Sequence, residues 1–378
     1  ELKAELSRTP VRTSDKATIP RSAHTANLHE QARYFFKRGL LPWFVAGNAS
    51  SGWITRWESE LLEHPEEFIQ TYGPVFAGDT NALIRFVYSV SDAFHQKLIA
   101  FLRSEVWSGI IFKYIALTGD KIQTLRNFYL RQLNEPQQSG NRNSSVASRL
   151  VIEAMETLKQ AFDVPEEEIV EILDTFIQSD VSDSSEAVDN NTEQIPENTV
   201  TVVSVEDQQA EIPGELYVTN AGLVLLHPFL SVLFSHTKLT EDNVWLSKES
   251  QMTGVLLTQY LVYGSCNSEE HELVLNKVLC GMEISEPVNV QLQLPQSLKD
   301  EADNMLQQAI AHWNAPGSLS LASLRESFLQ REGKLTLEPE AMHLKVDRKG
   351  WDVLLSTLPW SFSIVKGAVM KTIVYVEW

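Results

Sequence analysis

The sequence predicts a mainly α-helical protein: a helical amino-terminal domain, an acidic linker, and a carboxy-terminal α+β domain with a few short strands. Apolar residues recur at three- and four-residue steps through the first half, periodicity vanishes after Gln178, and the last part mixes helical runs with strand-like alternation. With 378 residues and 43% hydrophobic composition, the chain can bury at least one sizeable core, and its length favours two or three domains.

The first two segments differ in periodicity. Residues 1–27 are polar and follow neither a period of 2 nor of 3.6, so we expect a flexible arm that orders on a partner, if at all. Residues 28–178 are expected to form a domain of about six helices. One predicted helix face consists of Leu83, Val87, Val90, Phe94, Leu98 and Phe101. Further faces consist of Ile122, Leu125, Tyr129 and Leu133, and of Val151, Met155, Leu158 and Phe162. Asp163 and the acidic residues after Pro165 mark the start of the last helix.

The linker, residues 179–214, has too little apolar surface to offset the entropy of ordering, so we expect it to be disordered or extended. Its exception is Thr199–Val205, whose alternation is typical of a strand that could join the sheet of the next domain. From Asp163 to Glu215 there are 16 acidic residues and no Lys or Arg, within a net charge of -19. This field argues against nucleic acid and anionic membranes as partners.

The carboxy-terminal domain, residues 215–378, is predicted to be mixed. Leu223–Phe234, Gly254–Tyr263 and Ser297–Trp313 are expected helices. A further helix begins either at a capping box on Ser323 or one turn earlier, near Leu321. Met342, Leu344 and Val346 alternate with polar residues as in a half-buried strand, and Ile373–Trp378 is the expected partner strand.

Several segments, taken in order and spacing, carry a resemblance. They are Phe36–Phe44 (with Leu41-Pro42-Trp43), Tyr217–Leu230, Leu275–Gly281, Leu324–Leu335, and the aromatic tail Leu358–Lys366 with Tyr375–Trp378. They resemble the contractile injection system tape-measure family, whose phage-tail-like bacterial particles drive a tube through a sheath. The resemblance covers residues 215–378 well and 28–70 loosely.

The resemblance implies a non-enzymatic structural and assembly protein that governs tube and sheath length. It implies docking to tube and to baseplate or spike hub, in several copies about a symmetry axis, with assembly in the cytoplasm before enclosure in the particle. An adaptor at the baseplate or terminator that nucleates assembly without measuring length is the alternative, and an enzyme with an unrecognised site is a further one. Candidate docking or core residues are Leu41, Pro42, Trp43, Asn220, His227, Pro228, Asn276, Gly281, Arg325, Arg331, Leu358, Pro359, Trp360, Tyr375 and Trp378.

The sequence contains no recognisable catalytic or cofactor-binding motif that would argue against this structural role. It has no Gly-x-x-x-x-Gly-Lys-Ser/Thr, Gly-x-Gly-x-x-Gly or Gly-x-Ser-x-Gly motif, and Cys266 and Cys280 do not form a metal-binding pair. The run Glu269–Glu272 could bind a metal, but its spacing favours a solvated helix start. We therefore expect no catalytic residue, cofactor or metal.

Three further groups have structural interpretations. His227 is expected to bond backbone freed by Pro228. Arg331 and Lys334 flank Gly333, interpreted as a helix cap. The tryptophans are interpreted as core anchors or, where exposed, as parts of a docking surface. The apolar run Ala221–Phe234 is too short to cross a bilayer.

A protein that sets the length of a tube by its own extent must be able to span that length. Roughly fifty residues around the linker would reach 75 to 150 Å, and the whole chain as one helix about 570 Å. The measuring role therefore requires a short structure, unfolding of domains inside the tube, or additional chain.

Overall fold

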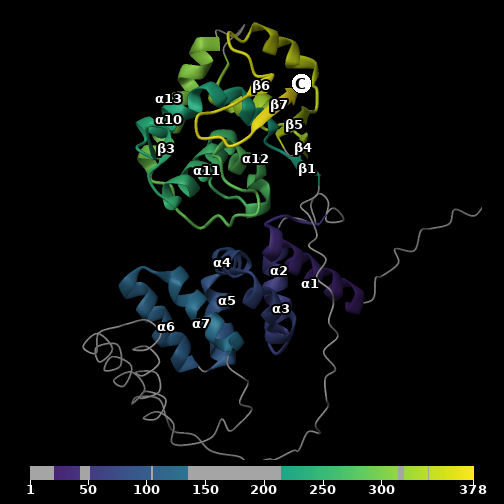
Figure 1. Cartoon of the computed structure of the whole chain (residues 1–378), viewed down its shortest axis with the longest axis vertical. Helices are drawn as coiled ribbons and strands as arrows, with labels where there is room; N and C mark the ends of the chain where they lie inside the picture. Colours follow the sequence, from purple (N-terminus) through teal and green to yellow (C-terminus); the bar gives the residue numbers. More distant parts are fainter. Residues whose placement is uncertain (1–20, 43–51, 104, 135–213, 314–318, 339) are drawn as a thin grey trace, which may run out of the picture.

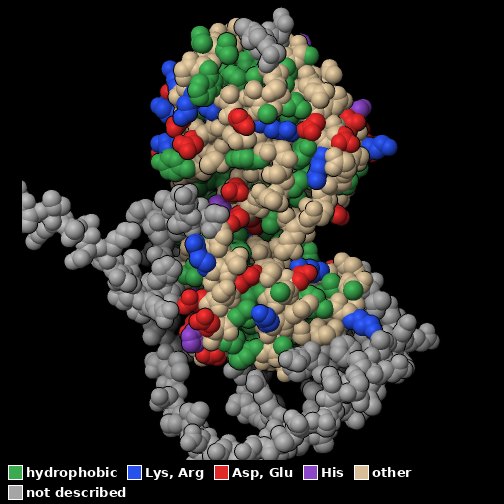
Figure 2. Space-filling view, turned by 180° about the vertical axis from the view of Figure 1, so that it is seen from behind, with side chains coloured by type: hydrophobic (Ala, Val, Ile, Leu, Met, Phe, Trp, Pro, Cys, Tyr) green, Lys and Arg blue, Asp and Glu red, His purple; other side chains and the backbone are tan. Residues whose placement is uncertain are grey.

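The computed structural model describes residues 21–42, 52–103, 105–134, 214–313, 319–338 and 340–378. The described residues form two bodies along the long axis, named here the helical domain (residues 21–134) and the carboxy-terminal domain (residues 214–378) (Figure 1). Seen from behind, the bodies meet at a narrower waist (Figure 2). The expected helices at Val151–Phe162 and after Asp163, the linker up to residue 213 and the expected strand Thr199–Val205 within it lie outside the described residues.

The helical domain contains seven described helices. They are α1 (Arg21–Arg38), α2 (Trp53–Glu63), α3 (Glu67–Gly78), α4 (Thr80–Ser89), α5 (Asp92–Leu102), α6 (Glu105–Thr118) and α7 (Lys121–Asn134). The predicted boundary of the flexible arm at residue 27 is wrong, because α1 already begins at Arg21 and residues 21–27 are helical. Pro20 precedes this helix and no Gly or Pro interrupts it before Gly39, a sequence that permits an early helix start.

The apolar stripe from Leu83 to Phe101 belongs to two helices, although its spacing predicts one face. Ser91 separates α4 from α5 in an extended conformation, and its hydroxyl accepts a hydrogen bond from the Phe94 amide at 3.2 Å. The stripe stays continuous because both helices bury their apolar residues in the same core. The prediction for α7 is confirmed, since Leu125 and Tyr129 are fully buried.

Aromatic side chains fill the core of the helical domain. Trp53, Trp57 and Phe36 are fully buried, and Phe36 packs edge-on against Trp57 with ring centroids 5.1 Å apart. The Trp57 indole donates a hydrogen bond of 2.5 Å to the Tyr72 hydroxyl. These contacts position α1, α2 and α3 around one another, which sets the surface that α4 presents toward the carboxy-terminal domain (Figure 1).

The carboxy-terminal domain mixes helices with two sheets. Its helical elements are the 3-10 helix η2 (Ala221–Leu226), α10 (His227–His236), α11 (Lys248–Tyr263), the 3-10 helix η3 (Glu270–Leu273), α12 (Val274–Leu279), α13 (Gln296–Trp313), α14 (Leu321–Leu324), the π-helical turn η4 (Arg325–Leu329) and the 3-10 helix η5 (Gly350–Thr357). Its strands are β1 (Glu215–Val218), β2 (Thr240–Glu241), β3 (Val244–Trp245), β4 (Gly333–Leu337), β5 (Ala341–Val346), β6 (Ile364–Val365) and β7 (Ile373–Glu377).

The larger sheet has the order β1-β4-β5-β7-β6, and β5–β7 is its parallel pair. One face is buried through residues such as Leu216, Leu335 and Leu344, which are aligned across three strands. The opposite face is exposed, with Tyr217 81% and Tyr375 41% accessible. This alternation confirms the strand predicted from Met342 to Val346, and β7 is its expected partner.

Three helix boundaries differ from the expectation, and one open choice is decided. The helix expected from Gly254 begins six residues earlier, at Lys248, because the Ser247 hydroxyl caps its first turn. The run Leu223–Phe234 is divided into η2 and α10, because Pro228 at the start of α10 has no amide hydrogen to continue an earlier helix. Ser320 caps α14 through the Ser323 amide at 3.1 Å, so the helix begins at Leu321, one turn before the capping-box alternative. Gly333 is not a helix cap: it begins β4.

Candidate functional site at the domain joint

The two candidate asparagines, Asn220 and Asn276, belong to a buried hydrogen-bond network in the carboxy-terminal domain. Asn220 donates to the Asn276 side-chain oxygen at 2.7 Å and to Gln259 at 3.1 Å, and Asn276 donates to the Thr258 hydroxyl at 3.0 Å. Asn220 and Asn276 are 0% exposed. Buried amides cost free energy unless they are paired, so this network fixes η2, α11 and α12 relative to one another.

Gly281 permits a close approach of two backbones. Its φ is 64°, and a Cβ built there would lie 2.0 Å from the Val369 carbonyl oxygen. Any side chain at this position would therefore push away the segment that leads into β7. The glycine follows Cys280, the residue that ends α12, so it links the amide network to the carboxy-terminal tail.

The prediction for His227 is confirmed. Its Nδ1 lies 3.0 Å from the Val224 carbonyl oxygen, four residues before Pro228, and this carbonyl also accepts the backbone amide of His227. Burial lowers the pKa of His227, and the hydrogen bond with Val224 partly opposes that shift. The pair stabilises the junction of η2 and α10.

The two candidate arginines form ion pairs, and each also donates to a carbonyl near a helix end, Arg325 to Leu261 of α11 at 3.1 Å and Arg331 to Ser327 of η4 at 3.3 Å. Arg331 is 2% exposed and donates to both carboxylate oxygens of Asp352, at 2.6 and 2.9 Å. Its guanidinium also lies 5.2 Å from the Trp378 ring centroid. Arg325 pairs with Asp303 at 2.6 Å. Burial raises the pKa of Asp352, but hydrogen bonds from Arg331, the Lys349 amide and Trp378 outweigh it, so the net shift is downward.

The tail residues dock against the domain. The Trp360 indole, which follows half-buried Leu358 and exposed Pro359, donates to the Leu225 carbonyl oxygen at 2.9 Å and stacks on His312 at 5.6 Å. The Trp378 indole donates to Asp352 at 3.0 Å. Tyr375 lies on the open sheet face and stacks on His343 at 5.3 Å. Most tail aromatics are therefore half-buried anchors, while Trp351 and Tyr375 remain more than two fifths exposed.

The candidate residues that follow α1 mark the place where the two domains meet. Leu41 packs on the helical core, Pro42 is buried, and Trp43 lies outside the described residues. Leu40, one residue earlier, is 4% exposed and belongs to the core of the carboxy-terminal domain. The polypeptide therefore passes from one core to the edge of the other directly after α1.

A buried charged cluster crosses this joint. Arg85 on α4 donates through Nε to both oxygens of Glu270, at 3.1 and 3.2 Å, and Glu270 accepts from Lys277 at 2.7 Å. Arg85 also donates to the Phe36 carbonyl in its own domain and to the Ser285 carbonyl in the other. The three side chains are at most 1% exposed. Burial lowers the pKa of Lys277, Arg85 adds to the shift, and Glu270 opposes it.

The cluster depends on Gly39. This residue has a φ of 71°, and a Cβ built there would lie 2.8 Å from Glu270 Oε1 and 3.1 Å from Arg85 Nε. Glycine is therefore needed both for the left-handed turn after α1 and for the approach of the carboxylate. The expected solvated helix start is wrong for Glu270, because this side chain is buried. The sequence spacing could not show this, since its partner Arg85 comes from a distant part of the chain.

Polar contacts surround the cluster. The Gly52 amide donates to Glu269 at 3.1 Å, and Lys121 donates to Gln291 at 3.0 Å. Glu269 and Glu272 form a capping box for η3, as the sequence predicts for a helix start. Burial lowers the pKa of His271, beside Glu269, to about 4.

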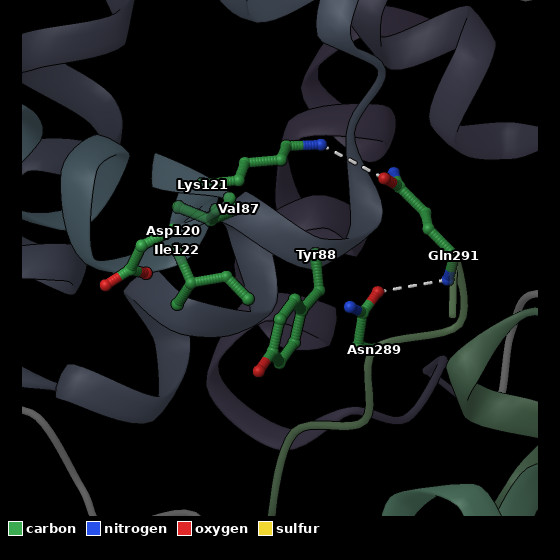
Figure 3. Close-up of a pocket in the computed structure, with 8 residues that line it drawn as sticks. Val87, Tyr88, Asp120, Lys121, Ile122, Asn289 and Gln291 are labelled. Atoms are coloured by element: carbon green, nitrogen blue, oxygen red, sulfur yellow. Dashed lines mark hydrogen bonds between the residues drawn. The ribbon is translucent and has the colours of Figure 1, made fainter. Parts of the chain in front are cut away.

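A hollow of about 150 Å³ lies at the same joint (Figure 3). Val87, Tyr88 and the turn before α7 line it from the helical domain, and Asn289 and Gln291 line it from the other. Burial raises the pKa of Tyr88, and the carboxylates of Glu249, Glu270 and Asp120 add to the shift. The packing between the domains is therefore incomplete at this hollow, which polar and apolar residues line together.

The described residues offer no group of three or more His, Cys, Asp or Glu side chains suited to a metal ion. Within the same residues, none of the helices combines the length and apolarity needed to cross a bilayer. Cys280 is buried, and burial raises its thiol pKa, as for an inert core residue.

Arg85 and Lys277 were not among the residues singled out from the sequence. A signal for both exists: Arg85 interrupts the apolar run Leu83–Val87, and Lys277 interrupts Leu273–Leu279. A charge inside a buried stripe requires a partner. The partner itself could not be identified from spacing, because the contact is long-range.

Comparison with known families gives a match over the full length of the sequence. Residues 1–378 match the model of the contractile injection system tape measure protein family. Comparison with curated proteins and with solved structures gives no match. The match extends through the segments whose resemblance was noted from the sequence, so the chain belongs to the contractile injection system tape measure protein family.

Proposed function

We propose that the chain governs the length of the tube in a contractile injection particle, with its two domains docking to different parts of that particle. The family match over residues 1–378 carries this proposal. The structure supports it through two bodies with separate cores, each able to present its own surface. On this proposal the partners are tube and baseplate or spike-hub proteins, and the chain ends inside the particle.

A length can be set only by chain that lies between the docked domains. Residues 135–213 connect α7 to β1, and they would reach about 120 Å as a helix or about 245 Å in a polyproline-like conformation. While the joint is closed, this reach adds nothing to the distance between the domains. Measuring therefore requires the domains to part.

The decisive experiment inserts twenty polar residues within 179–212 of the full chain and images assembled particles by electron microscopy. The tube should lengthen by about 30 Å if the insert is helical and about 60 Å if it is extended. The matched control carries the same insert in the exposed turn at Asp242 and Asn243 between β2 and β3. The control should leave tube length unchanged.

The closed joint favours a second candidate function. A protein whose two domains stay in contact would act as a compact adaptor that nucleates or terminates assembly at the baseplate or terminator. Particles of unchanged length in the insertion experiment would support this adaptor and reject the ruler.

A further inference from the structure

We propose that the joint is a reversible latch: the two domains separate as folded bodies, and the Arg85–Glu270 contact is the main bond that breaks. The latch is a property of the free chain and would exist whether or not the chain measures length. Three features of the joint carry this inference: its separate cores, its charges that each keep a partner, and its incomplete packing.

The cores are separate. The helical domain buries its aromatic residues in one cluster and the carboxy-terminal domain buries its own in another. From the helical domain, Leu40 enters the second core and Tyr34 packs partly against it. Separation therefore exposes little apolar surface, and a polar contact between domains of this kind behaves like a transient interface.

Each charge keeps a partner when the joint opens. Arg85 retains the Phe36 carbonyl of its own domain, and Glu270 retains Lys277 at 2.7 Å. Lys277 also keeps the Ile284 carbonyl at 3.0 Å. Breaking a buried ion pair is costly when one charge is left buried alone. Here water reaches both sides as the domains part, so no charge is left in that state.

The surrounding contacts are of the same exchangeable kind. Lys121 keeps its ion pair with Asp92 after it loses Gln291. The Gln291 amide bonded to the Val90 carbonyl, at 3.1 Å, can bond water instead. The hollow beside Tyr88 leaves part of the interface without packing contacts. The bond from Arg85 to Glu270 is thus the strongest directional contact that is present while the domains touch and is lost when they separate.

Single-molecule energy transfer on the full chain tests the latch. Dyes are placed by Ser59→Cys on α2 and Ser356→Cys on η5, both exposed positions, with Cys266→Ser to remove the accessible thiol. The unmodified joint should give a dominant high-efficiency population and a minor low-efficiency one. Arg85→Met should raise the ratio of low to high about 10- to 100-fold, the range for one lost charged hydrogen-bond contact.

Two comparisons make this result specific. Glu270→Gln should also raise the ratio, but less than Arg85→Met, because Arg85 then keeps its bond to the Ser285 carbonyl across the joint. The double variant should exceed Arg85→Met only slightly, because the Arg85–Glu270 contact is already lost in Arg85→Met. Arg103→Met is the matched control, since Arg103 donates to Gln132 within the helical domain at 2.9 Å. It should leave the ratio unchanged.

Hydrogen exchange of the same samples separates opening from unfolding. Amides of α5, α7, β4 and β5 should stay protected in Arg85→Met while the dyes move apart. An unchanged dye ratio in Arg85→Met and Glu270→Gln would overturn the latch. Loss of protection in both domains together with the change in dye distance would do the same, since the domains would then be one cooperative fold.

Discussion

Acid should destabilise the helical domain through one histidine in its core. His95 is fully buried, with Nδ1 2.9 Å from the Tyr129 hydroxyl and Nε2 3.4 Å from the Val87 carbonyl oxygen. Burial lowers the pKa of His95 to about 3, and the nearby Lys121 ammonium adds to the shift. The ordinary pKa of a histidine in an unfolded chain is about 6.5.

The sign follows from proton uptake. Between pH 6.5 and pH 3 the unfolded chain binds a proton at residue 95 and the folded domain does not, so stability falls as the pH falls. The slope approaches about 1.4 kcal/mol per pH unit. From pH 7.5 to pH 4.5, this one group should remove between about 2 and 3 kcal/mol from the free energy of unfolding.

Hydrogen exchange resolved by domain measures this loss, because amides of α5 and α7 report opening of the helical domain alone. The comparison variant is His95→Gln, which is neutral at every pH and can still contact Tyr129. It should be less stable at pH 7.5 but lose about 2 to 3 kcal/mol less on acidification. If wild type and His95→Gln lose equal stability between these pH values, the buried neutral histidine is not the cause.

Two further predictions concern the carboxy-terminal domain. Deleting Ile373–Trp378 removes β7 from between β5 and β6 and should yield insoluble protein; a soluble truncation that melts cooperatively would show that the tail is a partner-binding peptide. Gly281→Ala forces a Cβ toward the Val369 carbonyl at a φ of 64° and should lower the free energy of unfolding by about 2 kcal/mol or more. Gly350→Ala, at a glycine with no atom within 4 Å of the added Cβ, should change it little, and equal losses in chemical denaturation would refute the steric explanation.

Local patterns predicted the elements whose determinants are local. The spacing of apolar residues found α7, and the alternation around Leu344 found β5, because burial on one face follows directly from periodicity. The capping of α5 by Ser91 was missed, since two helices that share a core produce one continuous stripe. Glu270 was misjudged for a different reason: its burial depends on Arg85, and no local pattern encodes a contact between residues so far apart.

The candidate residues show the same division. Proline chemistry predicted the bond of His227 to the backbone, which involves neighbours in sequence. The roles of Asn220, Asn276 and Arg331 depend on partners in other elements, and the resemblance pointed to these residues without giving their contacts. Long-range polar pairing was therefore the part of the site that required coordinates.

The strand order of the larger sheet also has a mechanical meaning. β1 and β7 run in the same direction, so Gly214, before β1, and Trp378, after β7, lie toward opposite ends of the sheet. Tension between these two residues loads the strand ladders in shear, with many hydrogen bonds sharing the force. Tension between Gly214 and its neighbour Leu337 would instead peel β1 away from β4 one pair at a time. Inside a particle that propels its contents, the attachment points would thus decide whether this domain yields.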